Sequence, residues 1–224
     1  MPKHTGPEIQ RAADRFHTIG DGVETWHSFS YGRHYDPDRI GFGLVMAINT
    51  EHLAAGQGYD EHDHADVEIV TWVLSGTLLH QDSTGQSGLI HPGTAQRLSA
   101  GTGVRHAERN ASSDEAVVFV QMMLRSDHQD APHYSQVDVD PVPGVLTPTV
   151  PVHAPAELFA VRLDAGGSVT VPAAPRSLVI VTSGVIHADD TDLAPGDEAR
   201  FTAADEYDLS ASSAATALIW QLQR

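Results

Sequence analysis

Ile69–His80 (IVTWVLSGTLLH) reads as a hydrophobic strand, a Ser-Gly turn and a second strand, and a Pro-Gly turn follows in Leu89–Gly93 (LIHPG). The same order of features returns in Leu178–His187 (LVIVTSGVIH) and Asp192–Asp197 (DLAPGD). The two copies lie roughly a hundred residues apart, whereas solenoid repeats recur about every 20–50 residues. The repetition therefore predicts two similar domains.

Short alternating segments rich in Val, Ile, Leu and Trp are separated by Gly, Pro and Asp along the chain. We expect strands at Val67–Leu74, Thr77–His80, Val117–Leu124, Leu158–Leu163, Leu178–Val181 and Thr216–Gln221. Many short strands joined by turns are typical of a sandwich or a barrel. One short helix is expected near Pro7–Phe16. The aperiodic segment Arg125–Pro155 is expected to link the two domains, which we place at residues 1–135 and 136–224 of an all-β protein.

The two copies differ where chemistry is expected. Glu61–Glu68 (EHDHADVE) precedes the first Ser-Gly, whereas Val169–Pro175 (VTVPAAP) precedes the second and contains no metal-ligand residue type. Gly103–Glu108 (GVRHAE) follows the first Pro-Gly, whereas Ala203–Leu209 (AADEYDL) follows the second and contains no His. The sequence therefore predicts one domain with a site and a degenerate C-terminal copy without metal ligands.

The spacing of two residue pairs in the first domain indicates a metal site. On a strand, residues i and i+2 point to the same face, so His62 and His64 can both enter the barrel interior. His106 and Glu108 repeat this spacing on a later strand. We expect these four side chains to supply three nitrogens and one oxygen to a single metal ion, with open positions for water, substrate or dioxygen.

Other residues compete for these roles. Glu68 is the rival carboxylate, although we expect it to orient a ligand histidine rather than to bind the ion. His80 and His91 are interpreted as hairpin or loop residues. Five further histidines belong to no His-x-His or His-x-Glu pair, and we expect them to be bystanders: His52, His128, His133, His153 and His187.

Composition limits the metal and the partners. The chain of 224 residues has no cysteine, which excludes disulfides and thiolate ligands. A site of imidazole and carboxylate suits Fe, Mn, Ni, Cu or Zn. Open positions favour a redox-active ion, whereas zinc would indicate a hydrolytic or structural site. The net charge of −17 argues against direct binding to nucleic acid or to anionic membranes. Without an apolar signal-peptide core or membrane span, a cytoplasmic protein is expected.

A series of short motifs carries a family resemblance. They are His27–Tyr31 (HSFSY), Tyr35–Pro37 (YDP), Gly41–Gly43 (GFG), His62–Thr71 (HDHADVEIVT), His80–Gly85 (HQDSTG), Ile90–Gly93 (IHPG), Gln96–Gly103 (QRLSAGTG) and His106–Glu108 (HAE). In these motifs the chain resembles the pirins, a family of two-barrel cupins, and in length it is similar to the shorter bacterial members. The similarity is dense from His27 to Leu124 and looser beyond. The general cupin pattern is also visible, because five residues separate Gly56 from His62.

The resemblance implies a bicupin with the metal in its N-terminal barrel, on His62, His64, His106 and Glu108. It also implies Fe(II) as the metal and, for some members, quercetin 2,3-dioxygenase activity on flavonols. Eukaryotic pirins are described instead as nuclear cofactors of transcription. The chain departs from many pirins at Asp63, where they have Pro, and at Ala65, where they have Arg. These changes predict a more acidic site mouth.

Three functions are therefore compared. The first is a dioxygenase that takes a small aromatic, flavonol-like substrate and O2, with Glu108 as the catalytic acceptor of the substrate proton. The second is a metal- or redox-sensing interaction module without turnover, whose partner would be a protein rather than DNA. The third is a purely structural metal, which would be sealed from solvent.

Overall fold

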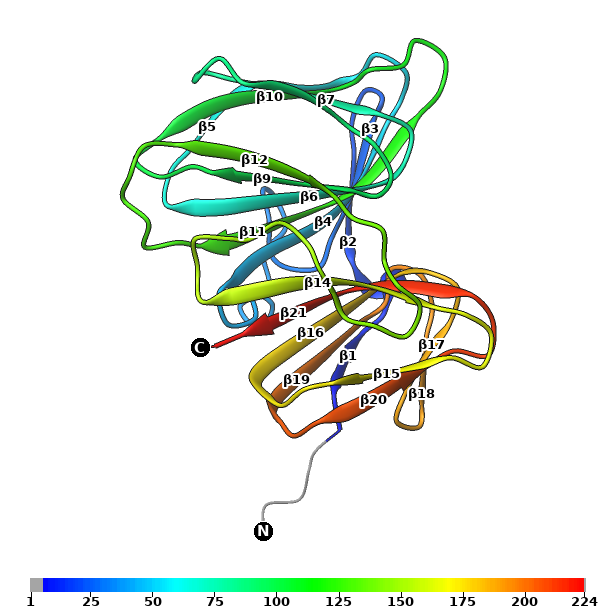
Figure 1. The fold of residues 1–224 in the computed structure, drawn as a ribbon. Helices are drawn as coiled ribbons and strands as arrows, with labels where there is room; N and C mark the ends of the chain where they lie inside the picture. The colour runs from blue at the N-terminus through cyan, green and yellow to red at the C-terminus, as the bar shows by residue number, and fades with distance from the viewer. Residues whose placement is uncertain (1–5, 224) are drawn as a thin grey trace. The chain divides into compact units, whose positions relative to one another are not determined.

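The computed structural model describes residues 6–223, which form an all-β fold with one turn of 3-10 helix at Ala12–Asp14 (Figure 1). Within these residues, no helix has the length and apolarity needed to cross a membrane. The helix expected near Pro7–Phe16 is reduced to this single 3-10 turn. That segment holds β1 (Glu8–Gln10), which pairs antiparallel with β19 (Glu198–Ala204), and Ile9 packs against an apolar core. Backbone pairing with a sheet edge has overridden the local helical pattern.

The chain forms two compact units, and each takes in a segment from elsewhere in the sequence. The first unit is Arg15–Val139 together with Val150–Ala154. The second contains Asp140–Thr149, the chain from Pro155 onward and the N-terminal segment that ends at Asp14. The boundary predicted after residue 135 falls inside β12 (His133–Asp138), and the exact domain limits stay a prediction.

The first unit is a barrel of two sheets, which we call the N-terminal barrel. The larger sheet contains, in spatial order, β12, β9 (Thr94–Ser99), β6 (Val67–Ser75), β11 (Val117–Arg125), β4 (Val45–Leu53), β3 (Val23–His27) and β2 (Phe16–Ile19). The smaller sheet contains β5 (Gly58–His64), β10 (Val104–Asn110), β7 (Leu78–Asp82) and β8 (Ser87–Ile90). Neighbouring strands within both sheets pair antiparallel.

The second unit repeats this architecture and is called the C-terminal barrel. Its larger sheet contains β1, β19, β16 (Ala174–Ser183), β21 (Ala215–Leu222), β14 (Ala156–Leu163) and β13 (Thr147–Pro148). Its smaller sheet contains β15 (Ser168–Val171), β20 (Tyr207–Ser210), β17 (Ile186–Ala188) and β18 (Thr191–Leu193). The strand order β15-β20-β17-β18 matches β5-β10-β7-β8 of the first barrel, which confirms the two-barrel fold that the repeat predicted.

All six expected strands are present, but the segment Arg125–Pro155 is more structured than expected. It contains β12, whose side chains are exposed or half-buried along its whole length. A strand whose side chains are solvated on both faces shows no hydrophobic alternation, so its sequence gave no strand signal. Its backbone nevertheless pairs with β9 over His133–Asp138.

The repeated Ser-Gly has one structural reason in both barrels. Gly76 and Gly184 follow β6 and β16 with φ of 77° and 69°, a region that favours glycine. A Cβ at Gly76 would lie 2.6 Å from the backbone oxygen of Ala116, and one at Gly184 would lie 2.4 Å from that of Ala214. Each glycine therefore allows a hairpin turn to pass close to the backbone just before another strand of the same barrel.

Substituting Gly184 with Ala is expected to lower the free energy of unfolding by about 1–3 kcal/mol, because backbone strain and a backbone clash coincide there. Thermal or urea unfolding measures the change. Gly20→Ala is the matched control, because its new Cβ meets the nearest atom at an ordinary 3.4 Å. Equal stability of the two variants would contradict this explanation of the repeat.

Candidate metal centre

A band of buried polar side chains crosses the interior of the N-terminal barrel. Along β11, the inward positions run from Val117 and Phe119 through Gln121 to Met123, and only Gln121 is polar. The same change occurs on neighbouring strands, where inward polar residues follow or lie between apolar ones: Asn49 and Glu51 on β4, Thr71 on β6, and His106 and Glu108 on β10. Buried polar groups cost folding free energy unless they are paired, so such a band indicates a site.

The C-terminal barrel has apolar residues at the matching strands. Val169 and Val171 on β15 and Leu209 on β20 belong to one continuous buried cluster. These strands correspond to β5 and β10, which carry the candidate ligands. Among the residues that the structure describes, both groups able to hold a metal ion lie in the N-terminal barrel.

Pairing between β5 and β10 brings the predicted histidines together. His106 is the backbone partner of His62, and Val104 is the partner of His64. The ring centroids lie 4.4 Å apart for His62 and His106, 5.0 Å for His64 and His106, and 4.8 Å for His62 and His64. One ligand atom from each of the three lies within 4.8 Å of the others.

Glu108 belongs to a second group that shares His106 with the first. Its ligand atoms, together with those of His80 and His106, lie within 4.8 Å of one another. The register between β10 and β5 shifts between His106 and Glu108, so that Glu108 pairs with Tyr59. The structure thus places the four predicted ligands in two overlapping groups, and it adds His80, which sequence spacing had marked as a hairpin residue.

The histidine nitrogens fit a metal ion. The Nε2 atom of His64, the Nδ1 atom of His80 and both ring nitrogens of His106 are buried without a hydrogen-bond partner. His62 is oriented by a 2.8 Å hydrogen bond between its Nδ1 and the backbone oxygen of Asp60, which leaves Nε2 free. Buried nitrogens without partners are costly in a protein interior, and a bound ion would satisfy them.

Burial favours the neutral form of His64 and His106. Burial is the main reason that the pKa of His64 falls to about 4, with the neighbouring His62 adding to the decrease. The pKa of His106 falls to about 2 for the same reason, with His62, His64 and His80 adding to it. Neutral imidazole is the form that binds metal, so no proton has to leave at neutral pH.

The metal-free protein is expected to lose stability when the pH falls from 6.5 to 5. The unfolded chain protonates its histidine near pH 6.5, whereas folded His106 stays neutral down to about pH 2. One such group contributes about 2 kcal/mol over this interval, and the contribution is lost as the pH falls. Urea unfolding of wild type and His106→Gln in the presence of a chelator measures it.

The variant is expected to show the smaller loss. Burial raises the pKa of Glu108, so the contribution of Glu108 to stability increases as the pH falls. This effect is present in wild type and in the variant, and the difference between the two proteins therefore reports on His106. Equal pH dependence in both proteins would contradict this interpretation.

Glu108 is a fully buried carboxyl group held by one partner. Gln121 donates from Nε2 to both carboxyl oxygens, at 2.9 Å and 2.8 Å. Burial raises the pKa of Glu108 to about 7, an effect that Gln121 opposes and that Glu51 reinforces. A carboxyl group with this pKa can accept and return a proton near neutral pH. Gln121 was missed in the sequence, although a lone amide inside the apolar strand VVFVQMMLR could have revealed it.

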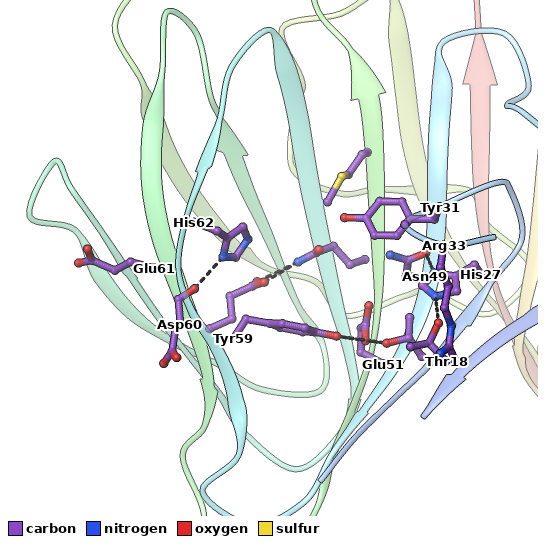
Figure 2. A pocket seen from close by; sticks show the side chains of 15 residues that line it. Thr18, His27, Tyr31, Arg33, Asn49, Glu51, Tyr59, Asp60, Glu61 and His62 are labelled. Atoms are coloured by element: carbon purple, nitrogen blue, oxygen red, sulfur yellow. Dashed lines mark hydrogen bonds between the residues drawn. The ribbon is translucent and has the colours of Figure 1, made fainter. Parts of the chain in front are cut away.

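A cavity of about 650 Å³ opens beside these groups, with His62 and Glu108 in its wall. Figure 2 shows His62 on one side of this cavity and His27, Asn49 and Thr18 on the other, with Tyr59 reaching between them. The Tyr59 hydroxyl donates to Glu51 over 2.6 Å. Donor groups for an ion and a space for an organic molecule therefore adjoin.

Glu68 has a different role from the one expected. It is buried on β6, where its Oε2 accepts hydrogen bonds from the Ser99 hydroxyl at 2.8 Å and the backbone N–H of His153 at 3.1 Å. Its other partner is Arg97, at 4.0 Å. The expectation that Glu68 orients a ligand histidine is therefore wrong: it fastens the segment Val150–Ala154 to the N-terminal barrel.

The mouth of the site contains a cation that the sequence argument overlooked. Arg105 is the backbone partner of the exposed Asp63, and it forms an ion pair with Glu61 at 3.6 Å. Arg105 and Asp63 both line a smaller cavity, which His64 also lines. Arg105 thus adds a positive charge to the site mouth on the strand next to Asp63, even though position 65 is Ala.

The fold and site define a class: a tandem of two cupin barrels in which the first barrel carries imidazole and carboxylate groups suited to a transition metal. Comparison with known proteins identifies the family. The pirin profile matches residues 9–124, and a profile described as the quercetinase C-terminal cupin domain matches residues 147–222. The chain belongs to the pirin family.

Several relatives support this assignment. A Mycobacterium tuberculosis protein, named provisionally as a quercetin 2,3-dioxygenase, is 41% identical over 230 residues, which cover 96% of this chain and 94% of that protein. The quercetin 2,3-dioxygenase of Escherichia coli K12 is 38% identical over 160 residues, covering 67% and 69%.

Solved structures agree. The crystal structure of YhhW from Escherichia coli superposes with a TM-score of 0.92 at 30% identity, covering 96% of this chain and 97% of YhhW. A second structure, of this bacterial pirin in complex with nickel(II), gives a TM-score of 0.91 at 28% identity, covering 97% and 99%.

Proposed function

We propose that the protein is a metal-dependent dioxygenase that acts on flavonols such as quercetin. The observation that carries the proposal is the adjacency of the ligand groups and the cavity, because His62 and Glu108 belong to both. The names of the relatives point to the same reaction. A cavity of about 650 Å³ also lies within the range of about 300–1,000 Å³ that is usual for small-molecule sites.

In this proposal His62, His64, His106 and Glu108 hold one divalent metal ion. Fe(II) is the proposed metal, and the oxygen and nitrogen donors would also accept Mn, Ni, Cu or Zn. A bound ion supplies Lewis acidity, which lowers the pKa of a hydroxyl beside it, and the redox activity that dioxygen chemistry requires. The unpartnered imidazole nitrogens and the absence of cysteine from the sequence both fit such an ion.

Glu108 is the proposed acceptor of the substrate proton. Its pKa, raised to about 7, allows a carboxylate to take the proton of a phenolic hydroxyl and to release it later. Gln121 donates to both carboxyl oxygens and therefore fixes the position of Glu108 in either state. The loss of that proton makes the flavonol ring electron-rich enough to react with dioxygen.

The wall of the cavity positions the rest of the substrate. Tyr31, Tyr59 and Met123 offer apolar surface that excludes water from the reacting end. His27 lies opposite, where its ring nitrogens are hydrogen-bonded to Asn49 at 2.9 Å and to Thr18 at 3.0 Å. These polar groups suit the hydroxyls at the far end of a flavonol.

Oxygen consumption and loss of flavonol absorbance test the proposal. Protein loaded separately with Fe(II), Mn(II), Ni(II) or Cu(II) is expected to turn over quercetin with at least one of these metals. Luteolin is the matched control, because it lacks the 3-hydroxyl group of quercetin and should not react. No turnover of quercetin with any of the four metals would overturn the proposal.

The interaction module and the structural metal are less well supported by the geometry. A sealed structural site does not need a cavity beside it, whereas His62 and Glu108 line one. A cytoplasmic location also stays a prediction, as does the absence of direct nucleic-acid binding.

A further inference from the structure

His80 and Asp82 form a buried pair that the proposed reaction does not use. Both lie on β7, and neither side chain is exposed to solvent. The Nε2 atom of His80 lies 3.2 Å from Oδ2 of Asp82. The other carboxyl oxygen of Asp82 accepts hydrogen bonds from the Thr84 hydroxyl at 2.6 Å and from the Thr84 backbone N–H at 2.8 Å. A carboxylate can only accept hydrogen bonds, so Nε2 of His80 must be the donor to Asp82.

This hydrogen bond decides which nitrogen of His80 remains free. Because Nε2 carries the proton, Nδ1 has the lone pair, and Nδ1 is buried without a partner. The ring is also held from the side, since it stacks on Tyr134 with centroids 4.8 Å apart. A histidine whose second ring nitrogen donates to a carboxylate is the usual arrangement of a metal-binding histidine.

The ring of His80 lies beside the candidate metal centre, with its centroid 5.3 Å from that of His106. His80 is the backbone partner of Glu108, and Asp82 is the partner of His106. The ligand atoms of His80, His106 and Glu108 lie within 4.8 Å of one another. The strands β5, β10 and β7 therefore each present two residues, spaced i and i+2, to the same interior.

We propose that His80, held by Asp82, is a further ligand of the metal ion, so that the ion has two overlapping donor groups with His106 in common. The outer group is His62, His64 and His106, and the inner group is His80, His106 and Glu108. The inference rests on the proposed function only in assuming that an ion binds here. With His80 among the residues that would hold the ion, Glu108 would be available to accept a proton.

Cu(II) is the probe, because pulsed electron paramagnetic resonance detects the histidine nitrogens coupled to it and calorimetry measures its affinity. His80→Ala is expected to remove one histidine from the spectrum and to weaken Cu(II) binding by at least about tenfold. His91→Ala is the matched control, because His91 is exposed and its Nδ1 bonds to Thr77. A His80→Ala variant with the spectrum and affinity of wild type would overturn the proposal.

Asp82→Asn provides a second test if His80→Ala does not fold. It keeps the volume of the side chain and perturbs the tautomer of His80, so an affinity loss of about 10- to 100-fold is expected. Unchanged affinity in this variant also overturns the proposal. Neither readout involves flavonol turnover. If wild type binds Cu(II) through His80 but oxidises no flavonol, the proposed enzymatic function is overturned and the proposed ligand role of His80 is not.

Discussion

Replacing Glu108 with Gln is expected to lower kcat for flavonol oxidation by about 100- to 10,000-fold, the range that general acid–base groups contribute. The amide is isosteric with the carboxyl group but cannot accept the phenolic proton. Fully buried and held by Gln121, Glu108 is the one carboxyl group of the inner donor group. Steady-state oxygen uptake with quercetin measures the effect, and metal content is determined on the same samples to separate lost metal from lost proton transfer.

Glu51→Gln is the matched control for this substitution. Glu51 is also a buried carboxyl group in the cavity wall with a raised pKa, but it accepts its hydrogen bonds from Thr25 and Tyr59 and belongs to neither donor group. Its substitution is expected to change kcat by less than about tenfold, because Gln keeps an oxygen for these donors. A Glu108→Gln variant that retains a third or more of wild-type turnover would contradict the assigned role.

Removing the metal is expected to destabilise the protein strongly. An ion present at about 1,000 times its dissociation constant stabilises the folded state by about 4 kcal/mol, and that contribution disappears with a chelator. Chelation also leaves the buried nitrogens of His64, His80 and His106 without partners. Thermal unfolding with and without EDTA measures the change in Tm.

The variant His106→Ala provides the control for chelation. His106 belongs to both donor groups, so its removal should make Tm insensitive to EDTA. Wild type whose Tm does not respond to EDTA, despite containing metal, would show that the ion is not coupled to folding at this site.

The two-barrel architecture could be predicted because the motifs that indicate it lie within short stretches of sequence. Ser75-Gly76 and Ser183-Gly184 repeat since a hairpin in each barrel passes close to another backbone segment, which only glycine permits. The pairs His62/His64 and His106/Glu108 could be found because side chains on a strand repeat every two residues. These signals do not depend on which strands become neighbours.

The sequence does not show roles that depend on distant partners. His80 has the same i, i+2 spacing to Asp82 as the other pairs have, and it lies on a hairpin strand as expected, but the sequence gives no sign that both side chains are buried. Glu68 lies near His64 in sequence, yet its partners Ser99 and His153 come from far along the chain. The strand β12 was missed because its solvated side chains lack alternation.

The central claim is that one transition-metal ion binds in the N-terminal barrel on residues that include His106. Elemental analysis of purified wild type and His106→Ala, each after reconstitution with Fe(II) and removal of loose metal, tests it most directly. Wild type is expected to retain about one equivalent of iron and the variant, which lacks the residue common to both donor groups, almost none. Wild type that retains no metal, or a folded variant that retains as much as wild type, would contradict the claim.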